Sequence, residues 1–249
     1  MIEHSRLLDV LGVEGELLAS SAEDASEDAP VAMCPGMTIG GTVRHVGSVY
    51  RLVVAWLDEG RRPGDWHRDQ EPGESAVAYQ RDALRVLLER LAAHPPDEYA
   101  STWWPADHTF GFWRRRMAHE TVIHRTDVQA AAGLERTEIA EDLALDGVDE
   151  VLTLWFAQKL PVLGLSGTKA GTVAVRTGGQ AWVTRAGPGE TTAWRCSARE
   201  AEGADATVSG DPAQVYLWLW GRLPLTAVVF GGEFDLAGQL WALLRLATR

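Results

Sequence analysis

The chain has 249 residues and a formal net charge of −12, from 35 acidic and 23 basic residues, with 46% hydrophobic and 23% charged residues. This composition is typical of a globular protein with one large or two modest domains. A protein that binds duplex nucleic acid needs a basic face to displace counterions from phosphates, and the sequence has no basic run beyond Arg114-Arg115-Arg116. Nucleic acid and an anionic membrane surface are therefore excluded as expected partners.

The first half of the chain has the apolar periodicity of helices. The pattern predicts helices over residues 2–19, 38–57, 77–93 and 109–132. Gly12 marks a possible break in the first helix, Thr38 or Thr42 can cap the second, and Gly133 can cap the end of the fourth. The segment 60–73, rich in Gly, Pro and charge, is expected to be a long loop. Four helices joined by loops predict a four-helix bundle.

The pattern changes after Glu138. A helix is expected over 143–159, and alternating apolar residues predict strands at 172–176, 181–184, 192–196, 206–208 and 227–230. Two more helices are expected, at 212–220 and 234–246. The fold class is therefore predicted as α+β, with an N-terminal four-helix bundle at 1–138 and a small α+β domain with an antiparallel sheet at 139–249.

The clearest chemistry lies in the fourth predicted helix. Glu120 and His124 are four residues apart, so they project from one helical face with Cβ atoms about 6 Å apart. Zinc accepts imidazole nitrogen and carboxylate oxygen, and catalytic zinc sites commonly use three protein ligands and leave one position open. His45, on the second predicted helix, is the natural third ligand, because bundle sites are built from facing helices. The other histidines fit less well, namely His4, His67, His94, His108 and His119.

Other interpretations of these residues stay open. A Glu/His pair at this spacing also arises by chance, and His45 alone is compatible with a hydrogen-bonded core histidine. Cys34 and Cys196 form neither a metal-binding spacing nor a disulfide framework, so we interpret them as reduced thiols, with a reactive cysteine as the alternative. The N-terminus has no signal-peptide core, and no apolar stretch reaches the roughly 20 residues that cross a bilayer, so we expect a cytoplasmic protein.

Six segments, taken in order, resemble the mycothiol-dependent maleylpyruvate isomerase family, whose N-terminal half belongs to the DinB-like helix bundles. They are residues 34–38 (CPGMT), 43–47 (VRHVG), 112–121 (FWRRRMAHET), 124–127 (HRTD), 208–212 (VSGDP) and 217–222 (LWLWGR). The resemblance covers nearly the whole chain. It implies His45, Glu120 and His124 as metal ligands, a sterol-carrier-like C-terminal domain and a functional role for Arg222. Met37 departs from the family, whose members usually have Trp after Cys-Pro-Gly.

The resemblance implies a metal-dependent enzyme that activates a low-molecular-weight thiol, mycothiol, for S-transfer or for cis–trans isomerisation of a small electrophilic substrate. The expected metal is zinc, although His₂Glu sites also accept nickel or iron. Asp127 can accept the free N–H of a metal-bound histidine; alternatively it is a surface acid paired with Arg125 or Arg116. Arg222 can bind a carboxylate through its planar fork, or form a salt bridge between the domains.

Two rival functions come from other classes. One is a metal-containing protein that binds a small ligand without catalysis. The other is a zinc hydrolase, which needs a general base near the metal that Glu120 cannot easily provide while it is a ligand. The chain is expected to act as a monomer or a small homo-oligomer.

Overall fold

The computed structural model describes residues 2–64, 71 and 73–248, and the chain divides into two compact units, Ile2–Thr137 and Glu138–Arg249. Part of the long loop expected at 60–73 lies outside the described residues, and so does His67. Among the described helices, none is both long enough and apolar enough to cross a membrane.

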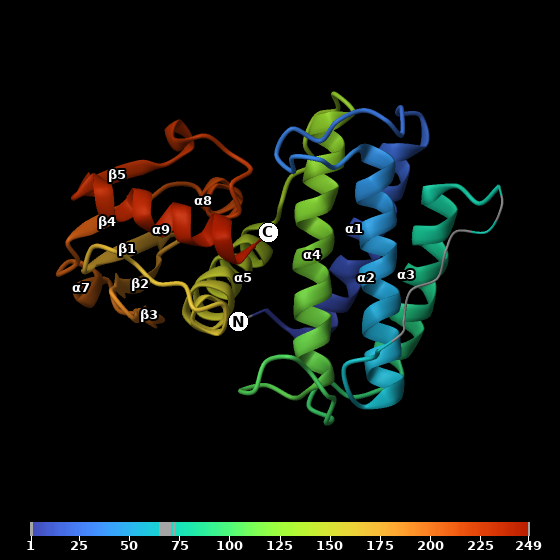
Figure 1. Ribbon diagram of the computed structural model, residues 1–249, viewed down its shortest axis with the longest axis horizontal. Coiled ribbons are helices and arrows are strands. Elements are labelled where there is room, and N and C mark those ends of the chain that lie inside the picture. Colours follow the sequence, from blue (N-terminus) through green and yellow to red (C-terminus); the bar gives the residue numbers. More distant parts are fainter. Residues whose placement is uncertain (1, 65–70, 72, 249) are drawn as a thin grey trace. The chain divides into compact units, whose positions relative to one another are not determined.

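The first unit is the predicted bundle of four helices (Figure 1). Its helices are α1 (His4–Glu23), α2 (Ile39–Glu59), α3 (Ala76–Ala92) and α4 (Phe110–Ala131). The helix α1 runs unbroken past Gly12. Of the two possible caps of α2, Thr38 is used, and its hydroxyl accepts from the Gly41 backbone N–H at 3.1 Å. Ser75 and Thr109 cap α3 and α4 in the same way.

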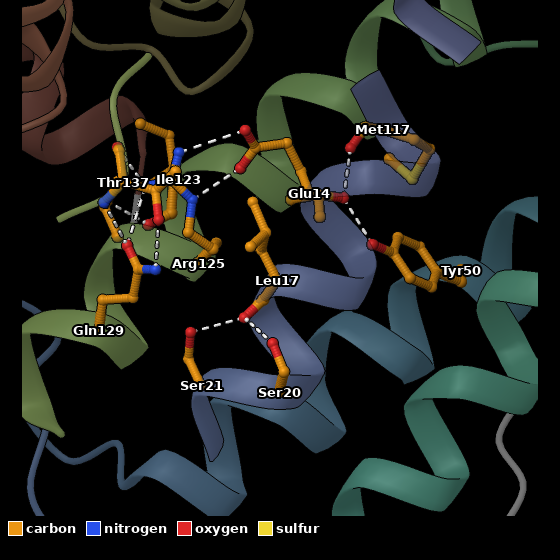
Figure 2. Close-up of polar contacts among 12 residues, drawn as sticks. Glu14, Leu17, Ser20, Ser21, Tyr50, Met117, Ile123, Arg125, Gln129 and Thr137 are labelled. Carbon is orange, nitrogen blue, oxygen red and sulfur yellow. Dashed lines mark hydrogen bonds and ion pairs between the residues drawn. The ribbon is translucent and has the colours of Figure 1, made fainter. Parts of the chain in front are cut away.

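A hydrogen-bonded network lies inside this bundle, between α1 and α4 (Figure 2). The buried guanidinium of Arg125 donates to both carboxylate oxygens of Glu14, at 2.6 and 3.3 Å. It also donates to Gln129 Oε1 at 3.0 Å and to the Thr137 carbonyl at 2.9 Å. Nearby, the Tyr50 and Thr121 hydroxyls lie 2.5 Å apart and link α2 to α4. A buried charge is tolerated only when it is paired and hydrogen-bonded, and this network meets both conditions.

The second unit confirms the α+β prediction. Its helical elements are α5 (Glu141–Glu150), the π-helix η1 (Val151–Lys159), α6 (Leu160–Val162), α7 (Ala198–Ala201), α8 (Pro212–Leu219), η2 (Leu225–Ala227) and α9 (Phe234–Ala247). Its strands are β1 (Gly171–Thr177), β2 (Gln180–Gly187), β3 (Glu190–Cys196), β4 (Ala206–Ser209) and β5 (Val229–Gly232), in the order β3-β2-β1-β4-β5. One sheet face packs on α7 through Ala174, Val183 and Ala201. On the opposite face, Trp182 Nε1 donates to Asp149 of α5 at 2.8 Å.

The antiparallel sheet that the sequence predicts contains one parallel ladder. Three ladders are antiparallel, but β1 pairs with β4 in parallel, with Val173 opposite Ala206. The reason is the connection after β3. It crosses by way of α7 to the far side of β1, instead of turning back in a hairpin, and a crossover of this kind delivers a parallel strand.

The end of α8 requires glycine. Gly221 has φ 72°, its N–H donates to the Trp218 carbonyl, and the Arg222 N–H donates to the Leu217 carbonyl at 2.8 Å. This pair of bonds is a Schellman motif, which needs a left-handed residue. A Cβ on Gly221 would overlap the guanidinium of Arg245, which donates to the Leu219 carbonyl. The motif therefore fixes the backbone of Arg222, the next residue.

We expect Gly221→Ala to lower the free energy of unfolding by at least about 2 kcal/mol, through left-handed strain and the displaced Arg245 bond. Gly133→Ala is the matched control, because Gly133 also has φ 70° but a Cβ there would meet nothing within 4 Å. Strain alone should cost the control about 1 kcal/mol. Urea unfolding of both variants measures the difference, and equal losses would show that Arg245 simply moves aside.

Candidate metal centre

The structure brings His45, Glu120 and His124 together on the facing helices α2 and α4. Glu120 Oε1 lies 3.2 Å from His45 Nε2 and 3.3 Å from His124 Nε2. The two imidazole rings meet edge to face, with centroids 5.0 Å apart. One ligand atom from each residue lies within 4.8 Å of the others. Glu120 and His124 share a face of α4 because they are one helical turn apart.

The cluster lies where the bundle opens to solvent. The side chain of His45 is 42% exposed, whereas those of Glu120 and His124 are 16% and 14% exposed. The neighbours Val43 and Val46 are fully buried, so His45 lies at the margin of the apolar stripe of α2. A small molecule can therefore approach the cluster from the side of His45.

The two carboxylate oxygens of Glu120 have different partners. Oε1 faces the two histidines, and Oε2 accepts from Arg116 Nη2 at 2.7 Å. Burial works against the charged form, but the contacts with His124 and His45 and the charge of Arg116 hold the pKa of Glu120 well below its usual value. Arg116 is itself buried, although an Arg-rich run is ordinarily a solvated helix face. Glu120 is thus a fixed carboxylate that offers one oxygen to the histidines.

Asp127 approaches His124 from the other side of its ring. Asp127 Oδ2 lies 3.2 Å from His124 Nδ1, and the Asp127 side chain is fully buried. Burial opposes the imidazolium, but the carboxylates of Asp127 and Glu120 raise the pKa of His124 to about 9. Arg125 binds Glu14, and Arg116 binds Glu120. A cation that binds Nε2 requires neutral imidazole, so binding it releases a proton.

Cys34 also lies beside this cluster, and the sequence interpretation missed it. Its Sγ is 3.4 Å from Asp127 Oδ2, and Cys34, His124 and Asp127 form a second group of possible donors within 4.8 Å of one another. The loop before α2 brings Cys34 here from 93 positions away in sequence. Periodicity cannot reveal such a contact, because it links a loop to a helix.

The remaining candidates lie elsewhere. The His4 ring packs against the backbone of Gly111. His94 Nδ1 lies 2.9 Å from Glu98 Oε1, and His119 is fully buried in α4. Arg222 belongs to the second unit, where its Nη1 donates to the Trp220 carbonyl at 2.7 Å.

The donor set of the cluster fits zinc. Zinc binds imidazole nitrogen and carboxylate oxygen at about 2.0–2.2 Å in tetrahedral geometry, which places neighbouring donor atoms roughly 3.3–3.5 Å apart. The two measured N–O separations of 3.2 and 3.3 Å agree with that spacing. Magnesium and calcium prefer all-oxygen sites, so two imidazoles argue against them. Three protein donors leave a coordination position for a small molecule.

Comparison with known proteins gives matches along most of the chain. A family model for the mycothiol maleylpyruvate isomerase N-terminal domain matches residues 10–129, and one for the corresponding C-terminal domain matches residues 142–239. Two solved structures are similar, a mycothiol-dependent maleylpyruvate isomerase and a histidine-to-alanine mutant of that isomerase. Each gives a TM-score of 0.56 and 17% identity, and covers 93% of this chain and 95% of that chain. No curated protein matches. At this identity, the structures show a shared fold.

Proposed function

The chain belongs to the mycothiol maleylpyruvate isomerase family, and from that membership we propose that it is a metal-dependent enzyme that activates mycothiol for reaction with a small electrophilic substrate. The reaction is cis–trans isomerisation, or transfer of the thiol to the electrophile. The observation that carries the proposal is the approach of His45 Nε2 and His124 Nε2 to one oxygen of Glu120, at 3.2 and 3.3 Å.

Zinc is the proposed metal, with His45, Glu120 and His124 as its ligands. When bound, the metal lowers the pKa of a coordinating thiol, so that the nucleophilic thiolate is present at neutral pH. Arg116 fixes the second oxygen of Glu120. Asp127 orients the His124 ring through Nδ1, as carboxylates commonly do behind metal-binding histidines. The exposed side of His45 admits the thiol and the substrate.

Arg222 is proposed to bind a carboxylate of the substrate or of the thiol. A guanidinium matches a carboxylate in geometry and charge. The Schellman motif at Gly221 holds its backbone in place, and the Trp220 carbonyl accepts from one of its nitrogens. A fixed guanidinium of this kind loses little freedom when it binds an anion.

The geometry favours thiol activation over hydrolysis. A zinc hydrolase needs a carboxylate or imidazole that can take a proton from water. Both oxygens of Glu120 already have partners, and Asp127 Oδ2 contacts His124 and Cys34. A purely structural zinc is usually closed by four protein ligands, whereas this cluster supplies three.

The test is to measure mycothiol binding by calorimetry, with the zinc-loaded protein and with the protein freed of metal by a chelator. We expect binding that requires zinc, weakened by at least roughly tenfold without it, because coordination supplies the main contact to sulfur. Isomerisation of maleylpyruvate is then followed with zinc and mycothiol together and with each alone. Mycothiol binding that is unchanged by removal of zinc would refute thiol activation at this cluster.

A further inference from the structure

Cys34 lies within a short loop whose two sides are joined by backbone pairing. Pro30 and Thr38 form an antiparallel bridge, and the Val31 N–H donates to the Met37 carbonyl at 3.0 Å. Within this ring, the Cys34 N–H donates to the Val31 carbonyl at 3.0 Å, and the Met37 N–H donates to the Cys34 carbonyl at 2.9 Å. The thiol is therefore presented by a fixed backbone.

The fixed thiol begins a series of contacts that leads to the metal cluster. Cys34 Sγ donates to Asp127 Oδ2 at 3.4 Å, and the same oxygen lies 3.2 Å from His124 Nδ1. On the far side of the ring, His124 Nε2 lies 3.3 Å from Glu120 Oε1. The thiol and the metal cluster are thus on opposite sides of one imidazole.

We propose that Cys34 is a positioning residue for the metal centre, an inference that rests on the proposed function. Its thiol donates to Asp127 Oδ2 and holds that oxygen against His124 Nδ1. The Asp127 side chain is fully buried, and a carboxylate only accepts hydrogen bonds, so it needs donors that fix its rotamer. With Asp127 fixed, the ring of His124 keeps Nε2 directed at the cluster.

This role differs from ligation. A cysteine that binds the metal has its sulfur beside the other donor atoms, whereas Cys34 Sγ contacts Asp127 on the Nδ1 side of the His124 ring. A hydroxyl can replace a thiol as a hydrogen-bond donor, whereas a methyl group cannot. The conservative serine variant therefore separates positioning from any chemistry that needs sulfur.

We expect Cys34→Ala to weaken zinc binding by roughly 3- to 10-fold, at or below the usual effect of losing a group behind a metal ligand. Cys34→Ser should stay within about twofold of the wild type, because its hydroxyl still donates. Cys196→Ala is the matched control, the same substitution in the second unit, and should leave zinc affinity unchanged. Chelator competition gives the affinities, and circular dichroism checks that each variant is folded.

Crystal structures of the metal-free wild type and Cys34→Ala supply a readout that needs no metal. We expect Asp127 Oδ2 to leave His124 Nδ1 in the variant. An unmoved Asp127, or zinc affinity of Cys34→Ala within twofold of the wild type, overturns the inference. A cobalt-substituted protein with a thiolate absorption band that Cys34→Ser abolishes also overturns it, because Cys34 is then a ligand. If the wild type binds no zinc, the proposed function fails. The position of Asp127 in the two metal-free crystal structures then tests by itself whether Cys34 holds Asp127 against His124.

Discussion

Replacement of Glu120 by alanine is expected to lower the affinity for zinc by at least roughly 1,000-fold. Glu120 supplies the one oxygen that both histidines approach, at 3.2 and 3.3 Å. Structural zinc sites bind with about 10–16 kcal/mol, so one donor of three or four is worth roughly 4 kcal/mol, which is about 1,000-fold. His45→Ala should lose a comparable amount. The measurement is metal content after dialysis, followed by chelator competition.

Glu120→Ala also leaves the buried guanidinium of Arg116 without its 2.7 Å partner, which can unfold the bundle. Glu120→Gln avoids this, because its amide oxygen still accepts from Arg116 while the charge is lost. Glu89→Ala, an exposed surface position on α3, is the control and should bind zinc like the wild type. A folded Glu120→Gln or His45→Ala protein with wild-type zinc affinity would exclude these residues as ligands.

The largest loss of stability is expected from Glu14→Ala, about 3–5 kcal/mol in the free energy of unfolding. The change leaves Arg125, whose side chain is 0% exposed, without the carboxylate that accepts from two of its nitrogens. Removing one partner of a buried ion pair leaves an uncompensated charge, which costs far more than the pair contributes. Urea unfolding followed by circular dichroism of the helices measures the effect.

The double variant Glu14→Leu/Arg125→Leu distinguishes this explanation from simple loss of packing. Without either charge it should be clearly more stable than Glu14→Ala, because no buried charge remains unpaired. The exposed pair of Arg85 and Glu89 is the control, and Glu89→Ala should change stability by less than about 1 kcal/mol. A double variant that is no more stable than Glu14→Ala would contradict the explanation.

Much of the fold follows from local patterns in the sequence. Hydroxyl residues cap the first turns of α2, α3 and α4, namely Thr38, Ser75 and Thr109, and the apolar spacing that follows each cap is helical. The same local rule places Glu120 and His124 on one face of α4. The parallel ladder between β1 and β4 could not be predicted, because alternation reveals a strand but not its partner.

The features that escaped prediction depend on contacts between distant segments. The burial of Arg116 and Arg125 follows from acids on their own and other helices, Glu120 and Glu14, so the residue type alone suggests a solvated face. Cys34 meets Asp127 only because of the loop before α2. Cys34 and Asp127 each lie in a motif that carries the family resemblance, residues 34–38 and 124–127, and this resemblance is the sequence signal that links them.

The hydrogen bonds at Thr137 decide where this chain can be divided. Gln129 and Arg125 both bind Thr137, the last residue of the first compact unit, yet the family match to that unit ends at residue 129. A fragment cut at the end of the match, or at the end of α4, would lose the Thr137 carbonyl, which accepts from the buried guanidinium of Arg125. A fragment cut after Thr137 would keep this bond, so the first compact unit extends several residues beyond the last turn of α4.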